Sequence, residues 1–184
     1  MITKLGTGYL DIIAILLLFA LKSKRPRAIF YGITLSAKFF LINCLKMIYL
    51  EARPYWVDKR LPPAELECAA DYANPSGSAL LITAFALNLA LDIIANHLVQ
   101  LYPFALLKGS KAAWRCVTVI LFLLTDAAAY ALAYFVSASR FEVKANAWNQ
   151  ILYGMLLGVW FGCVGFFILF EPLRAHLRAL HRAE

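Results

Sequence analysis

Long apolar runs alternate with short polar stretches along most of the chain. Most runs approach the roughly 20 residues that an α-helix needs to cross a bilayer. The first run is short and needs a thin bilayer, neighbouring helices or an extension back to Leu5. We therefore predict an all-α integral membrane protein with about five transmembrane helices. The segments are Tyr9–Leu21, Ile29–Leu50, Ser76–His97, Trp114–Val136 and Ala147–Phe170.

The same pattern predicts two parts of unequal size. We expect residues 1–170 to form one transmembrane helical bundle and residues 171–184 to form a basic amphipathic tail. In the tail, Leu173, Leu177 and Leu180 recur on one helical face, which is typical of a helix on a membrane surface or a partner. Composition agrees, because 62% hydrophobic residues, 16% charged residues and a mean hydropathy of +0.70 exclude an ordinary soluble domain.

Basic residues lie mainly on one side of the predicted bundle, whereas the loops on the other side mix both signs. By the positive-inside rule the basic side faces the cytoplasm or the mitochondrial matrix. The mixed side is then lumenal, periplasmic or intermembrane, so the endoplasmic reticulum and the mitochondrial inner membrane both fit. Topology and attraction to anionic lipid headgroups explain the net charge of +7 without a nucleic-acid partner. The basic side comprises Lys22, Lys24, Arg25, Arg27, Lys108, Lys111, Arg115, Arg174, Arg178 and Arg182.

Three short motifs fall on the mixed side, each beside the end of an apolar segment. A small-residue turn at a helix start leaves backbone N–H groups unpaired, and such a terminus attracts anions. The motifs are Lys46 with Arg53-Pro54, then Pro75-Ser76-Gly77-Ser78, and finally Ser139-Arg140 with Asn146 and Gln150. We predict that they converge on a phosphate or anion site formed by Lys46, Arg53, Ser76, Gly77 and Arg140.

In order and spacing, these motifs resemble the type 2 phosphatidic acid phosphatase superfamily, which includes lipid phosphate phosphatases and glucose-6-phosphatase. The resemblance covers roughly residues 30–170 and is closer to the glucose-6-phosphatase-like branch. The residues that favour this branch are Arg53-Pro54-Tyr55-Trp56, Cys68, Asn74-Pro75-Ser76-Gly77, Asn149-Gln150, Gly154 and Gly158. The resemblance implies a helical membrane fold with the motif loops gathered at one membrane surface.

Both histidines of the family pattern are replaced, by Ser78 in the second motif and Asn146 in the third. The resemblance implies that the second histidine attacks phosphorus and the first protonates the leaving oxygen. The carboxamide nitrogen of Asn146 is not basic and cannot be that nucleophile, and Ser78 does not titrate near neutral pH. Losing acid–base help alone typically costs about 10²- to 10⁴-fold in rate. The positions Ser78, Asn146 and Gln150 therefore indicate a remnant catalytic site.

Three functions remain open from the sequence. The first is a catalytically inactive accessory subunit of a larger membrane complex, with lipids and other membrane-protein subunits as partners. The second is an active lipid-phosphate or sugar-phosphate phosphomonoesterase, with Ser76, Ser78 or an activated water as nucleophile. The third is a lipid-binding or scrambling module. None of these requires a cofactor, and we find no cluster of metal ligands in the sequence.

Three charged residues lie deep in the predicted spans. At about 1.5 Å per residue, Lys38 is about 22 Å below Arg53, Asp92 about 24 Å below Ser76, and Asp126 about 20 Å below Arg140. An unpaired ion costs about 2.5 kcal/mol or more in hydrocarbon. We therefore predict that Lys38 pairs with Asp92 or Asp126. A polar or proton path across the membrane is the alternative.

The last apolar segment contains Gly154, Gly158 and Gly162 at four-residue spacing. Such a ridge of small residues lets another helix approach closely. The approaching helix belongs either to the same bundle or to another molecule.

Overall fold

The computed structural model describes residues 8–21, 25–58, 60, 71–95 and 110–172, and these ranges contain helices but no strand. This confirms the predicted all-α class. The predicted amphipathic tail, residues 173–184, lies outside the described residues. In chain order the elements are α2 (Tyr9–Ala20), α3 (Arg25–Tyr49), α4 (Pro54–Val57), α5 (Gly77–Ile93), α6 (Ser110–Glu142), α7 (Trp148–Val164) and the π-helix η5 (Gly165–Phe170).

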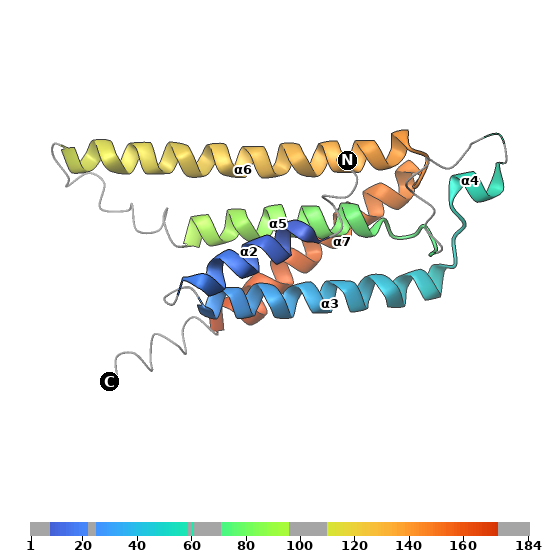
Figure 1. Cartoon of the computed structure of the whole chain (residues 1–184), viewed down its shortest axis with the longest axis horizontal. Coiled ribbons are helices and arrows are strands. Elements are labelled where there is room, and N and C mark those ends of the chain that lie inside the picture. Colours follow the sequence, from blue (N-terminus) through green and yellow to red (C-terminus); the bar gives the residue numbers. More distant parts are fainter. Residues whose placement is uncertain (1–7, 22–24, 59, 61–70, 96–109, 173–184) are drawn as a thin grey trace.

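The helices run roughly along the long axis of the molecule, with α3 and α6 on opposite sides and α2, α5 and α7 between them (Figure 1). The chain reverses direction between successive long helices, so α3 and α6 end where α5 and α7 begin (Figure 1). We call this the motif end, because it contains all three sequence motifs. Short α4 lies at the same end (Figure 1).

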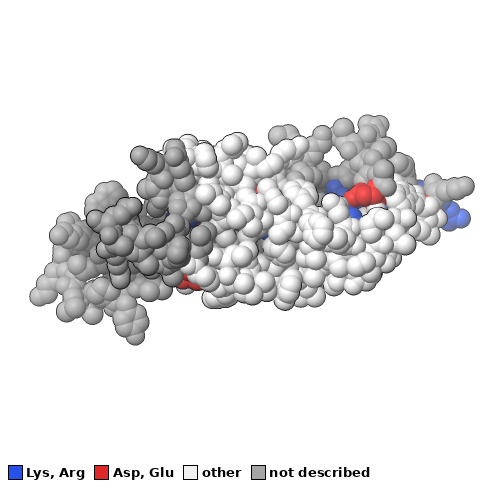
Figure 2. All heavy atoms as spheres, turned by 90° about the horizontal axis from the view of Figure 1, so that it is seen from below, with Lys and Arg blue, Asp and Glu red and all other residues white. Residues whose placement is uncertain are grey.

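Three stretches of helix are long and apolar enough to cross a membrane: Arg27–Val57, Val119–Glu142 and Trp148–Phe170. The other two predicted segments correspond to shorter apolar helices, Tyr9–Ala20 and Gly77–Ile93. Figure 2 shows the consequence on one face: the middle of the molecule is almost free of charged atoms, while red and blue atoms gather toward the motif end. An apolar middle with charge near its end is the surface expected of a protein embedded in a bilayer.

Helix α5 forms the centre of the bundle and packs along α7 through the three glycines of α7. A Cβ added to Gly154 would lie 2.6 Å from the Ser76 carbonyl oxygen, and one added to Gly158 would lie 2.7 Å from that of Leu80. At Gly162 the nearest atoms belong to the Leu87 side chain, 3.0 Å away. The glycine ridge therefore faces a helix of the same chain, and it brings the backbone of α7 against the start of α5.

The predicted partner of Lys38 is wrong. Its ammonium lies 3.0 Å from the Asp11 carboxylate of α2, and both side chains are almost completely buried. Asp92 instead pairs with Arg27 at 3.5 Å. One buried carboxylate oxygen of Asp126 has no hydrogen-bond partner among the described residues. Depth alone misled the prediction, because α2 and α3 are consecutive antiparallel neighbours whose facing residues pair directly.

Candidate anion site

Seven polar side chains from five elements or their flanking turns meet at the motif end, and we call them the polar cluster. They are Lys46 in the last turn of α3, Arg53 before α4, Asp71 and Ser76 before α5, Arg140 in the last turn of α6, and Asn146 and Gln150 around the start of α7. These side chains meet because helices begin or end at or near their positions. For example, Arg53 has extended backbone at the N-cap of α4, and Pro54 occupies the first turn, where proline is favoured.

Arg53 has an exposed fraction of only 2% and donates hydrogen bonds through all three guanidinium nitrogens. Nε donates to the main-chain carbonyl of Asp71 at 2.8 Å, and one Nη donates to the Asp71 carboxylate at 2.6 Å. The other Nη donates to the carbonyl of Ala145 at 3.0 Å. This guanidinium therefore ties the segment before α5 to the turn between α6 and α7.

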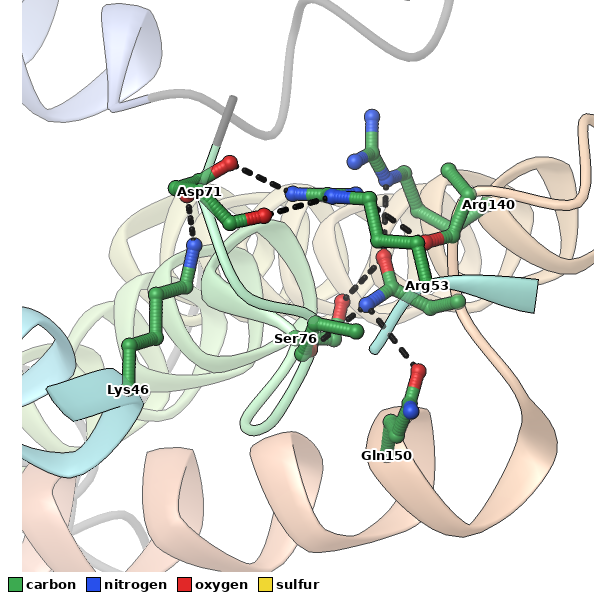
Figure 3. Close-up of polar contacts among 9 residues, drawn as sticks. Lys46, Arg53, Asp71, Ser76, Arg140 and Gln150 are labelled. Carbon is green, nitrogen blue, oxygen red and sulfur yellow. Dashed lines mark hydrogen bonds and ion pairs between the residues drawn. The ribbon is translucent and has the colours of Figure 1, made fainter. Parts of the chain in front are cut away.

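The Asp71 carboxylate lies between two cations (Figure 3). One oxygen accepts from Arg53, and the other forms an ion pair with the Lys46 ammonium. Burial alone would raise the pKa of Asp71, but the hydrogen bond and charge of Lys46, together with Arg53, hold that pKa below its usual range. Asp71 is therefore ionised at neutral pH.

Asn146, which the sequence predicted at the remnant site, is 3% exposed and uses both ends of its carboxamide (Figure 3). Its nitrogen donates to the carbonyl of Ala73 at 2.7 Å and to Gln150 Oε1 at 3.5 Å. Its oxygen accepts from Arg140 Nε at 3.3 Å and from the Ser76 hydroxyl at 3.4 Å. The side chain thus connects the turn before α5 with α6 and α7.

The start of α5 is held by α7. The backbone N–H of Ser76 donates to the carbonyl of Gln150 at 3.1 Å, and the Gln150 side chain accepts from the N–H of Ala147 at 2.9 Å. The Ser76 N–H, which we predicted as a donor to an anion, is therefore already hydrogen-bonded within the chain. Ser78 is buried in the first turn of α5, and none of the hydrogen bonds described above involves it.

Three further hydrogen bonds lie beside the polar cluster. The hydroxyls of Tyr49 and Tyr153 lie 2.9 Å apart, and Asn149 Nδ2 donates to the Glu51 carboxylate at 3.4 Å. The N–H of Ala73 donates to the main-chain carbonyl of Glu51 at 2.9 Å. The segment before α5 is therefore fixed to the end of α3 by backbone as well as by side chains.

The structure brings together the side chains of Lys46, Arg53, Ser76 and Arg140, with a carboxylate among them, and Gly77 follows Ser76 as the first residue of α5. Asp71 was not among the predicted site residues, although it is the acidic residue nearest in sequence to Pro75-Ser76-Gly77. That position was the available signal, since a carboxylate beside a cation motif is a candidate ion-pair partner. The described residues contain no group of three possible metal ligands. All three histidines, His97, His176 and His181, lie outside the described residues.

The bundle and the polar cluster define an all-helical membrane protein whose motif loops meet at one end. A family model of the PAP2 superfamily matches residues 27–173, so the chain belongs to the PAP2 superfamily. It is similar to the crystal structure of the transmembrane PAP2-type phosphatidylglycerolphosphate phosphatase from Bacillus subtilis, with a TM-score of 0.65 and 17% identity. The match covers 89% of this chain and 71% of that chain, and at this identity it shows the fold alone. No curated protein matches the chain.

Proposed function

We propose that this chain is a catalytically inactive PAP2-fold membrane protein that serves as a structural or accessory subunit of a larger membrane complex. The observation that carries the proposal is the environment of Asn146. The histidine nucleophile that the family resemblance implies needs a basic nitrogen with a lone pair directed at phosphorus, whereas the amide nitrogen of Asn146 donates to Ala73 and Gln150. This position holds the bundle together and offers no nucleophile.

The hydrogen bonds of the Arg53 guanidinium support the same proposal. In a phosphoryl-transfer site, a guanidinium stabilises negative charge that develops on the transferred group. Here the three nitrogens of Arg53 already donate to Asp71 and Ala145, and the side chain is almost fully buried. A cation engaged in this way contributes to the rigidity of the motif end. A rigid helical bundle without chemistry of its own is suited to a supporting role among other membrane subunits.

The outward faces of the bundle are compatible with that role. The part of α6 that lies in a candidate span exposes large apolar side chains along much of its length. Such a surface packs against lipid tails or the helices of other subunits. We further propose that the motif end faces the lumenal or intermembrane side of the endoplasmic reticulum or mitochondrial inner membrane, as the positive-inside rule predicts.

The proposal is tested by gentle detergent extraction, native electrophoresis and mass spectrometry of co-migrating proteins. Phosphatase turnover is measured on the same fractions with phosphatidic acid and a soluble sugar phosphate. We expect a high-mass complex that does not hydrolyse either substrate. A free small bundle that hydrolyses phosphate esters, with activity abolished by Arg140→Ala, would instead establish the phosphomonoesterase alternative. Turnover that appears only after Ser78→His is combined with Asn146→His would identify a decayed active site.

A further inference from the structure

Two of the three cations of the polar cluster, Arg53 and Lys46, differ sharply in exposure from the carboxylate partner that they share. The side chains of Arg53 and Lys46 are 3% and 12% exposed, whereas that of Asp71 is 53% exposed. Buried cations require a compensating anion, since an unpaired charge in a low-dielectric site is strongly unfavourable. The anion therefore reaches the cations from the solvent side, which is the side from which a diffusible ligand would approach.

The geometry of the contact is also that of a bound oxyanion. One carboxylate oxygen of Asp71 accepts from the Arg53 guanidinium and the other meets the Lys46 ammonium, so a single anionic group bridges two cations (Figure 3). A phosphate group binds arginine and lysine in the same manner, through separate oxygens. The main-chain carbonyl of Asp71 accepts from Arg53 Nε as well, which holds the residue over the site.

We infer that Asp71 is an intramolecular counter-anion that occupies the anion site of this chain and excludes an external phosphate group from Lys46 and Arg53. The inference rests on the proposed function, because it treats the site as one without catalysis. A site filled by its own chain stays closed at neutral pH in the wild type. Neutralising Asp71 leaves the buried Arg53 and the partly buried Lys46 without their shared anion, and the phosphate group of an inorganic ion or a lipid headgroup then has the chemistry to replace it.

The test compares the wild type with Asp71→Asn, and Asp58→Asn serves as a matched control. Asp58 is an exposed carboxylate at the same end of the molecule, and its side chain accepts from the backbone N–H of Arg60 instead of a buried cation. Each protein is purified in detergent, and binding of radiolabelled inorganic phosphate is measured by equilibrium dialysis at constant ionic strength. A parallel arm measures binding to nanodiscs with and without phosphatidic acid, which separates a lipid source of phosphate from a free one.

We expect Asp71→Asn to bind phosphate at least about tenfold more tightly than the wild type or Asp58→Asn, a difference of about 1.4 kcal/mol. Adding Arg53→Gln to Asp71→Asn should remove that gain. Equal binding by the wild type and Asp71→Asn in both arms, or no binding by a monodisperse Asp71→Asn in either arm, would overturn the inference. A gain that appears only with phosphatidic acid nanodiscs would identify the ligand as the lipid headgroup.

If Asp71→Asn is unstable, its recovery in different salts also tests the inference. Asp71→Asn that aggregates in chloride should be recovered as a monodisperse species when extracted in phosphate at equal ionic strength, because a bound ligand stabilises the folded state. Aggregation in both salts overturns the inference. Phosphatase turnover is read separately on the same samples. Turnover by the wild type would contradict the proposed function, whereas the binding and recovery measurements decide the role of Asp71.

Discussion

Asn146 is a structural residue of the motif end. Its carboxamide has both a donor and an acceptor end. Asn146 uses them to hold the Ala73 carbonyl on one side and Arg140 Nε on the other. This side chain therefore forms a bridge between the segment before α5 and the end of α6.

Replacing this side chain should destabilise the fold. In Asn146→Ala the buried Ala73 carbonyl and the Arg140 Nε lose their partner, so we expect the free energy of unfolding to fall by about 1–3 kcal/mol. Asn149→Ala is the matched control. Asn149 is exposed and makes one long bond to Glu51, so its loss should stay within about 0.5 kcal/mol. Thermal unfolding of both variants in the same detergent measures the difference, and equal melting temperatures would contradict the structural role.

The ion pair between Lys38 and Asp11 is the second prediction at this scale. Lys38→Met leaves Asp11 buried without its cation, which should cost about 3–5 kcal/mol of stability. Lys38→Met combined with Asp11→Leu removes both charges and should recover most of that loss. Thermal unfolding of the single and double variants forms a double-mutant cycle. Additive effects of the two substitutions would show that the charges do not interact.

At the scale of elements, the contact between α5 and α7 positions Ser76 and Gln150 of the polar cluster. The glycines of α7 admit the carbonyls of α5, which brings Ser76 within hydrogen-bond reach of the Gln150 carbonyl. Packing along these helices and chemistry at their ends are therefore coupled. A change in the distance between α5 and α7 should therefore alter the hydrogen bonds at the motif end.

Gly158→Ala tests this contact. The new Cβ would lie 2.7 Å from the Leu80 carbonyl oxygen and 3.2 Å from the Ala84 nitrogen, so the backbones must separate, at a cost of about 1–3 kcal/mol. The control is Gly32→Ala in α3, where a Cβ meets nothing within 4 Å. There the higher helix propensity of alanine should stabilise the protein by up to about 1 kcal/mol. Thermal unfolding in detergent should therefore shift in opposite directions, and a loss at Gly32 equal to that at Gly158 would refute the packing explanation.

Helices and close helix contacts could be predicted from the sequence, whereas ion-pair partners could not, for physical reasons. Apolar length and small-residue spacing are local properties, so the helices and the close approach of Gly154 and Gly158 could be predicted. Which side chain faces which depends on lateral packing, and residues at equal depth are not necessarily neighbours. Lys38 was therefore assigned the wrong partner, although Asp11, the only charged residue in the first apolar segment, was a visible candidate. Asp71 lay in a polar loop, where composition does not indicate which carboxylate pairs with the cations of the motif end.

At the scale of the whole molecule, the bundle has two ends. The motif end contains the polar cluster, and η5 lies toward the opposite end (Figure 1). Lys and Arg next to transmembrane segments are retained on the cytoplasmic or matrix side during insertion. In the sequence, basic residues cluster around the starts of α3 and α6 and after η5, so the proposed orientation places the polar cluster on the lumenal or intermembrane side.

Cysteine labelling tests that orientation with one residue at each end. In a variant whose four native cysteines are replaced, a single cysteine is introduced as Asp58→Cys at the motif end or as Pro172→Cys after η5, both at exposed positions. Sealed vesicles that expose the cytoplasmic or matrix face are treated with a membrane-impermeant maleimide. Pro172→Cys should be labelled at once, and Asp58→Cys only after detergent permeabilisation, since the bundle places them on opposite sides of the bilayer. The cysteine-free parent gives the background signal. The reverse pattern would invert the orientation, and labelling of both residues in sealed vesicles would contradict a bundle that separates the two ends across a membrane.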